Sequence, residues 1–556
     1  MSTYSVHVKL FVGGDLSGIQ KFLYNITSRH ASVSLKGRSA FLSNYLRKVC
    51  DRIEYTIEGN GVTVKKLYCS GGKFYLITDN TPAVCKAIDD YAKVVKEELW
   101  NEHRGQLGIN ISHVAYREED GKFIVEGHED DQNISSGVLW KYCNADFARQ
   151  KNQKFKELLI GKYHQFFDVQ KVGGVVPVCA LTGVESPDCR PLTEEDFKKK
   201  GLSLAEYIEE KDSDDVSDNA PVYLPSVINQ IVLGKTLSKK YGTKTFEQYA
   251  TTDEGVNNGI EGDTYLGILR MDIDGMGKRF IIGFDTLKEY ENFSGKVTNF
   301  FEGRIIKDKE GKTVRRIPSA IEILLDKHVA AGAEAHKYKE YVNVIYAGGD
   351  DLFIIGRWDR LVDFAKIIHD AVTCPEGEFL SPDYYFERTY IDVQDSNKEK
   401  HISISGGIAI VKPKFPIAKA AEMAGEAEEA AKDYREEKNT FNLFGKTVTW
   451  ESEFDEVEQY KDELIRVIRD VNDGKGKSLL HKLMLYGEIA NKNEQPGVQP
   501  NYSYIWHSAY YMKRYQERYR HEDVKKLCSQ LSRGITDHRT LQLITIAARW
   551  AELLLR

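Results

Sequence analysis

Two adjacent carboxylates stand in the sequence Gly348-Gly349-Asp350-Asp351, between two apolar runs typical of β-strands. This pattern predicts a buried β-hairpin with its acids at the tip, where the glycines allow a tight turn and the close approach of a bulky ligand. Two buried carboxylates side by side repel each other, so they are costly to keep unless a cation neutralises them. Carboxylate oxygens suit Mg²⁺, and we expect this hairpin to hold the ion against a nucleotide triphosphate.

A second pair of acids, Asp272 and Asp274, follows a short apolar segment at the end of a predicted strand. A palm-type antiparallel sheet places this strand beside the hairpin, so that the acids of both segments converge and bind one or two Mg²⁺ ions. Such ions clamp a triphosphate, lower the pKa of an attacking 3′-hydroxyl and neutralise the leaving pyrophosphate. Because successive residues of a strand face opposite ways, Asp350 is favoured over Asp351 as a core ligand, together with Asp272.

Taken alone, the pair at positions 272 and 274 would equally suit a capped turn. The glycine–carboxylate hairpin downstream favours the metal site instead. The predicted catalytic residues are therefore Asp272, Asp274, Asp350 and Asp351, and the predicted metal site comprises Asp272, Ile273, Asp350 and Asp351.

Glycines and a serine near these acids, and two lysines, are candidates for holding the nucleotide. Gly275 and Gly277, with Lys278 beside them, open a predicted helix whose backbone N–H groups and positive end would face phosphates. Lys432 lies at the end of a predicted Ala-rich helix and would reach a phosphate, although on its own it suits an ordinary solvated lysine. Ser405 belongs to a strand of small residues, which either a close ligand or a β-bulge explains.

The first part of the chain repeats this plan in a weaker form. A strand runs into a Gly/Asp loop, helices follow, and a strand–turn–strand hairpin carries Gly71 and Gly72 at its turn. Lys73 stands where the second copy has a carboxylate, and a lysine holds a phosphate but does not ligate Mg²⁺. One copy should therefore do chemistry while the other binds. Ser34 and Arg38 lie in a segment expected either to cradle a second triphosphate or to begin a capped helix near residues 38–54.

The pattern of strands and helices divides the chain into four parts. The first and third parts alternate strands and helices, the second is mixed and acidic, and the last shows helical periodicity without a convincing strand. Two unrelated α/β domains that both use Gly-Gly turns are the alternative to a duplication. The four predicted parts are residues 1–140, 141–254, 255–450 and 451–556.

Composition bounds the class of protein. With 556 residues, 41% hydrophobic and 29% charged, the chain is typical of a multidomain globular protein, and no apolar run approaches the ~20 residues of a membrane span. Eight scattered cysteines give no disulfide framework and favour a reducing cytoplasm. Cys179 and Cys189 supply too few ligands for structural zinc, so zinc is not expected. The net charge of −7 argues against coating nucleic acid with the whole surface, but leaves room for a local basic groove or for partner chains that hold nucleic acid.

Five motifs, taken in order along the chain, resemble one known family: the large palm-domain (polymerase/cyclase) subunit of type III CRISPR–Cas effector complexes. The second half also resembles the bacterial diguanylate cyclase fold, at Asp272, at the Gly-Gly-Asp-Asp turn and at Lys432. The five motifs are Gly14-Asp15-Leu16-Ser17-Gly18-Ile19-Gln20-Lys21-Phe22, Lys36-Gly37-Arg38-Ser39, Ser70-Gly71-Gly72-Lys73-Phe74, Leu269-Arg270-Met271-Asp272-Ile273-Asp274-Gly275-Met276-Gly277 and Gly348-Gly349-Asp350-Asp351.

The resemblance implies an α+β fold: two ferredoxin-like palm domains of the nucleotidyl cyclase type, a small connector domain and a C-terminal helical domain. It implies that ATP binds between the palms with Mg²⁺ or Mn²⁺. Target RNA paired with CRISPR guide RNA would switch on synthesis of a cyclic oligoadenylate messenger, within a cytoplasmic complex of several subunits. Many family members begin with an HD nuclease domain. Here the opening strand starts near Val6, so that DNase activity is not expected.

Three other functions remain open at this stage. Some relatives without the nuclease domain join AMP to S-adenosylmethionine, and the sequence leaves the product and the choice of base open. A stand-alone diguanylate-type cyclase is disfavoured because that fold works as a homodimer of single copies. A purely structural scaffold subunit is disfavoured because buried acids are costly to keep without a cation.

Overall fold

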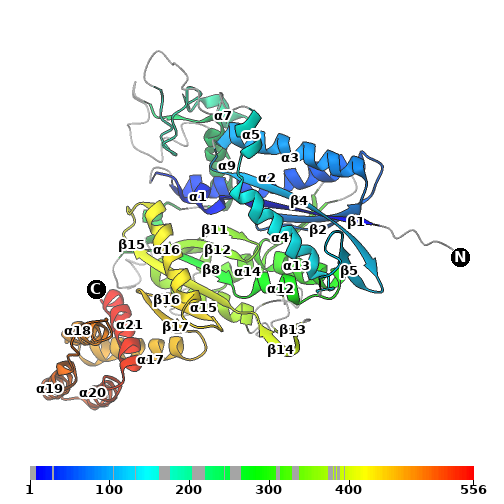
Figure 1. Cartoon of the computed structure of the whole chain (residues 1–556). Coiled ribbons are helices and arrows are strands. Elements are labelled where there is room, and N and C mark those ends of the chain that lie inside the picture. Colours follow the sequence, from blue (N-terminus) through cyan, green and yellow to red (C-terminus); the bar gives the residue numbers. More distant parts are fainter. Residues whose placement is uncertain are drawn as a thin grey trace.

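The protein, described here by a computed structural model, is built around two mainly antiparallel sheets, each covered by helices (Figure 1). No helix in the described part of the chain is both long and apolar enough to cross a membrane. The structure describes residues 8–27, 31–103, 105–131, 133–161, 176–202, 220–242, 244–250, 264–307, 313–328, 337–373, 380, 384, 389–392 and 395–556.

The first sheet has the strand order β2-β3-β1-β4-β5, and all its pairs are antiparallel. Helices α2 and α3 connect β1 to β2 and β3 to β4, which gives the predicted ferredoxin-like alternation. Both helices lie on the face of the sheet opposite α4 (Figure 1). The elements are β1 (Lys9–Ser17), α1 (Ile19–Tyr24), α2 (Ala31–Glu58), β2 (Val64–Ser70), β3 (Lys73–Asp79), α3 (Pro82–His103), β4 (Gly108–Glu119), β5 (Lys122–Val125) and α4 (Gly137–Asn152).

Strand β1 corrects one expectation. The predicted strand ended before Gly13 and a loop was expected to carry Asp15, but β1 continues through both residues to Ser17. The two glycines are needed there because side chains press on the strand: a Cβ atom on Gly14 would lie 1.9 Å from the ring of Phe74. The expected start of the strand near residue 6 lies outside the described residues.

The second sheet has the order β11-β12-β8-β15-β16-β17, with β8 in the place that β1 takes in the first sheet. Helix α15 covers one face and α16 the other. The elements are β8 (Leu266–Ile273), α12 (Met276–Ile282), α13 (Leu287–Phe301), β9 (Arg304–Lys307), β10 (Thr313–Ile317), α14 (Ala320–Leu325), η2 (Tyr338–Glu340), β11 (Val342–Gly348), β12 (Asp351–Arg357), α15 (Trp358–Thr373), β13 (Thr389–Asp392), β14 (Asp395–His401), β15 (Ile404–Val411), α16 (Ile417–Lys432), β16 (Thr440–Leu443) and β17 (Lys446–Thr449).

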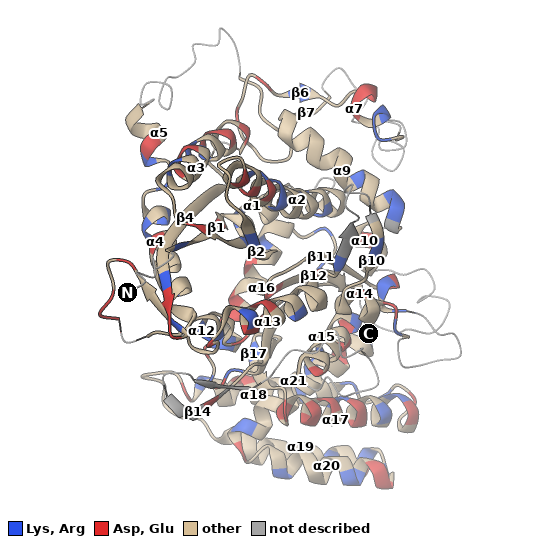
Figure 2. Ribbon diagram, turned by 90° about the vertical axis from the view of Figure 1, so that its right-hand side faces the viewer, with Lys and Arg blue, Asp and Glu red and all other residues tan. Residues whose placement is uncertain are grey.

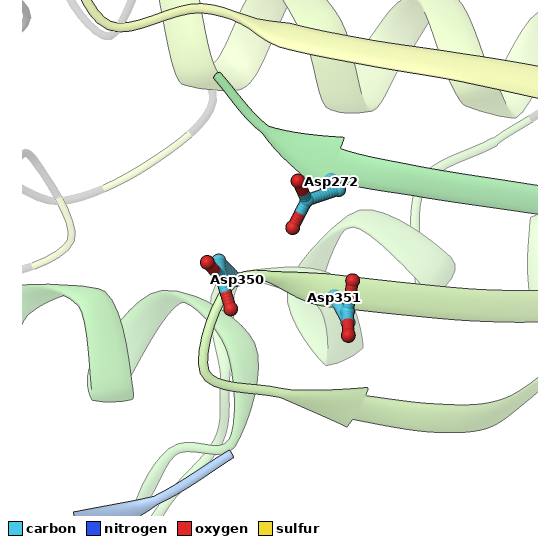
Figure 3. A group of neighbouring side chains, drawn as sticks. All are labelled: Asp272, Asp350 and Asp351. Atoms are coloured by element: carbon cyan, nitrogen blue, oxygen red, sulfur yellow. The ribbon is translucent and has the colours of Figure 1, made fainter. Parts of the chain in front are cut away.

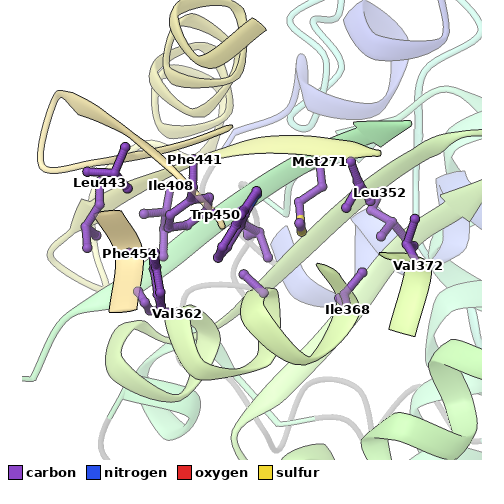
Figure 4. Close-up of a cluster of buried hydrophobic side chains, with 14 of the residues drawn as sticks. Met271, Leu352, Val362, Ile368, Val372, Ile408, Phe441, Leu443, Trp450 and Phe454 are labelled. Carbon is purple, nitrogen blue, oxygen red and sulfur yellow. The ribbon is translucent and has the colours of Figure 1, made fainter. Parts of the chain in front are cut away.

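The core beneath the second sheet fixes β8 and β12, the two strands that end in acids. Alternate residues of these strands point into an apolar layer with α15, and Figure 4 shows Met271 and Leu352 there beside Ile368. The layer continues to Trp450 and Phe454 at the start of the helical region. Because the strand period is two, the intervening residues Arg270 and Asp272 face the other side of the sheet.

Two further parts complete the chain: the segment that lies between the two sheets in sequence, and the last hundred residues. Figure 2 shows Lys/Arg and Asp/Glu interspersed over the last helices, with acids along α17. That region is helical, as predicted; parts of the expected connector lie outside the described residues. The elements are α5 (Lys156–Gly161), β6 (Arg190–Pro191), α7 (Glu194–Lys198), β7 (Val222–Tyr223), α9 (Pro225–Tyr241), α10 (Phe246–Ala250), α17 (Glu453–Arg466), η4 (Val467–Val471), α18 (Ser478–Lys492), α19 (Ser503–Arg518), α20 (Glu522–Gly534) and α21 (His538–Leu554).

Candidate metal and nucleotide site

Three carboxylates converge at the ends of β8 and β12. Asp272, Asp350 and Asp351 each offer an oxygen atom within 4.8 Å of the others, and no other such group of three or more His, Cys, Asp or Glu side chains occurs among the described residues. Register explains the meeting, because Asp351 pairs directly with Asp272 across the two strands. Asp350 joins them from the two-residue turn between β11 and β12 (Figure 3). All three donors are hard oxygen ligands, so the group fits Mg²⁺ or Mn²⁺.

The protein environment makes these charges costly. Burial raises the pKa of Asp272 to about 8, and the neighbouring Asp351 carboxylate adds to this rise. Burial and Asp272 raise the pKa of Asp350 to about 6, while burial and Asp350 raise that of Asp351 to about 6. Each carboxylate therefore resists ionisation chiefly because it is buried, and a neighbouring carboxylate adds to the effect. A divalent cation would remove this penalty, which is the physical reason to expect one here.

Lys432, predicted from the sequence to reach a phosphate, contacts the acids in the structure. It lies at the end of α16, where its Nζ donates to Asp272 Oδ2 and, over 2.7 Å, to Glu428 Oε1. Glu428 is itself buried and holds Arg270 of β8 through a contact of 3.0 Å. The lysine thus carries part of the compensating charge that the acids need. Glu428 was missed by the sequence reasoning, although its place one helical turn before Lys432 is a detectable signal.

Asp274 does not join the three carboxylates in the structure. It is buried, and its Oδ2 accepts hydrogen bonds from Ser403 Oγ at 2.7 Å, from Ser405 Oγ at 2.8 Å and from the backbone N–H of Asn439 at 3.2 Å. Ser405 lies opposite Asp272 in the strand register, yet its hydroxyl is committed to Asp274. Both residues therefore fasten the loop after β8 to β15. Ile273 has its side chain in the core, so only its backbone carbonyl is suited to a metal.

The glycine segment after β8 opens helix α12. Gly275 precedes the helix in the left-handed region, with φ of 77°. Gly277 and Lys278 follow in its first turn, and both are exposed. A Cβ atom at position 277 would meet no other atom within 4 Å, so packing does not require glycine there. These residues remain predicted phosphate ligands.

The two Gly-Gly turns touch each other. A Cβ atom on Gly71 would lie 2.4 Å from the Cα of Gly349, so the two backbones are in direct contact. Gly71, Gly72 and Gly349 all have positive φ, which only glycine adopts readily. Lys73 is exposed at the start of β3, and its charge opposes the rise in the pKa of Asp350. The three carboxylates and Lys73, which follows the first Gly-Gly turn, therefore lie in one region between the sheets.

The first sheet carries a counterpart of the acid–lysine pair. Asp15 of β1 pairs with Lys73 in register, as Asp272 of β8 pairs with Asp351. Lys151 of α4 lies 2.8 Å from the Asp15 carboxylate and so repeats the contact of Lys432 with Asp272. Neither residue was selected from the sequence. The available signal was the shared position of α4 and α16, which come after β4 and β15, the strands that pair with β1 and β8.

Ser34 and Arg38 have a different role from the one expected. Both are fully buried within α2, which already begins at Ala31, so neither a phosphate cradle nor a helix start describes this segment. Arg38 donates to the Phe22 carbonyl and, over 3.1 Å, to Gln230 Oε1 of α9. The motif thus serves the packing of α2 against α9, and these side chains are not open to a ligand.

Known protein families match both repeats of the chain. The family model for the Csm1 subunit domain B matches residues 8–171, and the model for the second palm domain of Cas10/Cmr2 matches residues 265–442. A CRISPR system single-strand-specific deoxyribonuclease Cas10/Csm1 (subtype III-A) of Methanocaldococcus jannaschii is 24% identical, over 80% of this chain and 60% of the relative. Its counterpart in Enterococcus italicus is also 24% identical, over 89% of this chain and 61% of the relative. The chain therefore spans about three-fifths of the curated relatives it matches.

Solved structures show the same fold. A Csm1–Csm4 cassette in complex with cA4 superposes with a TM-score of 0.59 and 17% identity, over 99% of this chain and 70% of that chain. A Csm1–Csm4 cassette in complex with one ATP superposes with a TM-score of 0.54 and 16% identity, over 97% of this chain and 70% of that chain. Together with the two family models and the ordered motifs, these matches show that the chain belongs to the Cas10/Csm1 family of large palm-domain subunits of type III CRISPR–Cas effector complexes.

Proposed function

We propose that this chain is a target-RNA-activated, Mg²⁺-dependent nucleotidyltransferase that converts ATP to a cyclic oligoadenylate messenger in a type III CRISPR antiviral complex. The observation that carries the proposal is the convergence of Asp272, Asp350 and Asp351 beside the contact of the two Gly-Gly turns. Its domains would be two palms, at residues 1–140 and 255–450, a connector at 141–254 and a helical domain at 451–556.

The residues of the site divide the work of phosphoryl transfer. Asp272, Asp350 and Asp351 would hold the cation, which when bound lowers the pKa of the attacking 3′-hydroxyl and neutralises the leaving pyrophosphate. Lys432 would then exchange its carboxylate partner for a phosphate, with Lys73 facing it from the other sheet. The 3′-oxygen forms a bond to the α-phosphorus, the bond from that phosphorus to the bridging oxygen breaks, pyrophosphate leaves, and the hydroxyl proton passes to solvent.

The choice of ATP and of partners rests on the relatives. Solved Csm1–Csm4 cassettes hold one ATP in one case and cA4 in another, which supports ATP as substrate and a cyclic adenylate as product for this chain. The same structures support a Csm4-type subunit as a neighbour. CRISPR guide RNA and target RNA are the proposed activators, and they would be held largely by the partner chains because the net charge of this chain is −7.

A reconstituted complex tests the proposal. With partner subunits, guide RNA, matched target RNA, Mg²⁺ and labelled ATP, we expect a new adenylate product whose mass identifies it. The double variant Asp350→Ala/Asp351→Ala should reduce product to background while target RNA binding stays unchanged. Asp462→Ala, an exposed acid on α17, is the control and should behave as wild type. Unchanged signalling by the double variant would refute the chemical assignment.

The same assay separates the alternatives. Addition of S-adenosylmethionine would yield an AMP conjugate of distinct mass if the site transfers AMP to that acceptor. A scaffold subunit would bind RNA and assemble, yet form no product with wild-type acids.

A further inference from the structure

A single carboxylate, Glu302, joins the two repeats at their turns. It follows the last residue of α13, in the second repeat, and its partners belong to the first repeat. Its Oε1 accepts from Ser70 Oγ and, over 3.3 Å, from the backbone N–H of Gly71, while its Oε2 lies 3.3 Å from Arg47 Nη2. The side chain of Glu302 is only 11% exposed. A largely buried carboxylate with three donors from the other repeat is a strong cross-domain contact.

The same carboxylate also lies against the second turn. A Cβ atom on Gly348 would come within 3.2 Å of Glu302 Oε1, and the next residue, Gly349, is the one that Gly71 touches. Burial raises the pKa of the neighbouring Tyr346 well above its ordinary value, and the charges of Asp351 and Glu302 add to the rise. Glu302 is therefore within the electrostatic reach of the predicted metal site.

The position of Glu302 makes a purely local role implausible. A negative charge at the C-terminal end of a helix is unfavourable, because the helix dipole places negative charge there too. Helix α13 does not need it for packing either, since its buried face consists of aromatic and aliphatic side chains that include Tyr290 and Phe293. The contact with the first turn compensates for the unfavourable charge at the end of the helix.

We propose that Glu302 is a positioning residue that locks the first Gly-Gly turn against the second, so that Lys73 faces the carboxylates at a fixed distance. The effect on catalysis rests on the proposed function, whereas the lock itself does not. Phosphoryl transfer depends on placing two reactants in line, so loss of the lock should lower kcat rather than weaken ATP binding. Replacing the carboxylate would also leave the buried Ser70 hydroxyl and Gly71 N–H without their acceptor.

A matched control lies on the same helix. Glu291 of α13 also reaches across to the first repeat, where Lys65 of β2 lies 2.8 Å away, but it does not touch either turn. Three variants therefore separate the lock from general contact between the repeats. Glu302→Ala removes the acceptor, Glu302→Gln keeps an acceptor oxygen for Ser70 and Gly71, and Glu291→Ala removes a different cross-domain ion pair.

Two measurements test the proposal. Hydrogen–deuterium exchange of the full chain without nucleotide should rise about tenfold at residues 70–73 in Glu302→Ala, and stay at the wild-type rate in Glu291→Ala. In the assembled complex, Glu302→Ala should lower kcat by about tenfold to a hundredfold with KM for ATP changed less than threefold, and Glu302→Gln should recover most of the rate.

The two readouts fail independently. If wild-type complex forms no product, the proposed function falls, but exchange at the turn still decides the lock. Wild-type exchange in Glu302→Ala would overturn the lock, and so would an equal rise in Glu291→Ala. Raised exchange with an unchanged kcat would overturn the positioning role. If Glu302→Ala fails to fold, Glu302→Gln and Arg47→Ala carry the test. Glu302→Gln should keep wild-type exchange at residues 70–73, and Arg47→Ala, which removes one partner of Glu302, should raise it. Wild-type exchange in Arg47→Ala would then overturn the lock.

Discussion

Two features of the structure raise the pKa of Asp351. Burial and the Asp350 carboxylate raise its pKa from 3.8 to about 6, so the folded protein binds this proton more tightly than the unfolded chain does. Between pH 4 and 6 the unfolded chain ionises first, and the folded state loses relative stability as pH rises through this window. Above pH 6 the cost is fully present. Without a metal, the site therefore lowers the free energy of unfolding at neutral pH. A bound cation would make the site's contribution to that free energy favourable.

The variant Asp351→Asn follows from this argument. At pH 7.5 in EDTA it should raise the free energy of unfolding by about 1 to 3 kcal/mol, because a buried charge that repels the neighbouring Asp350 carboxylate is removed. The gain should shrink as pH falls and vanish below about pH 3, where the carboxyl group is protonated in both states. Added Mg²⁺ should stabilise wild type and leave the variant nearly unchanged. Thermal unfolding at several pH values, with and without Mg²⁺, measures both effects, and a variant less stable than wild type in EDTA would contradict the argument.

Sequence reasoning predicted the three converging carboxylates more reliably than their surroundings. Asp272, Asp350 and Asp351 were accessible because strand period and the Gly-Gly turn fix where they lie. The preference for Asp350 over Asp351 has no support in the geometry, since both join the group. Asp274 follows Asp272 by two residues, yet the strand ends between them, and its direction depends on hydroxyl partners 129 and 131 residues away. Local pattern carries no information about such partners.

The start of helix α2 could not be predicted from the sequence. The helix runs unbroken from Ala31 to Glu58, through serines and a glycine that favour caps and turns over helix interiors. Packing against α9 overrides that preference: a Cβ atom on Gly37 would lie 1.9 Å from the carbonyl oxygen of Gln230, and one on Gly234 would lie 2.0 Å from that of Val33. The small residues that suggested a phosphate loop thus allow two helix backbones to touch.

The variant Gly37→Ala tests this explanation of the motif. The added methyl group meets a rigid carbonyl rather than a movable side chain, so the helices must separate, at a cost of about 1 to 3 kcal/mol. Gly277→Ala is the matched control, because that helical glycine has open space around it and should gain about 0.5 to 1 kcal/mol from propensity. Chemical denaturation measures both. Equal effects at the two positions would show that α2 and α9 do not depend on this contact.

At the scale of the whole molecule, the two repeats face each other like the halves of a dimer. Helix α2 contacts β11 while its counterpart α13 contacts β2, and α4 contacts α12 while α16 contacts α1. Each contact is thus matched by one in which the repeats exchange roles. The shared strand order could be predicted from the repeated motifs. This mutual arrangement could not, because no sequence pattern within one repeat reports on which face meets the other.

The contact between Gly71 and Gly349 lies at the centre of this arrangement. Its effect can be separated from that of backbone strain by comparing two glycines of the first repeat. Gly71 and Gly61 both have positive φ, so alanine should cost about 1 to 2 kcal/mol of backbone strain at either position. They differ in surroundings: a Cβ atom at 61 meets nothing within 4 Å, whereas one at 71 meets the Gly349 backbone at 2.4 Å.

Gly71→Ala should therefore lower the melting temperature beyond Gly61→Ala, and it should also speed hydrogen–deuterium exchange at residues 348–351, which belong to the other repeat. Gly61→Ala should leave that distant exchange unchanged. A single substitution that loosens a turn nearly 280 positions away would show that the two repeats form one site through backbone contact. Identical exchange in the two variants would mean that the turns meet without depending on each other, and Lys73 would then have to act at the carboxylates without a fixed separation.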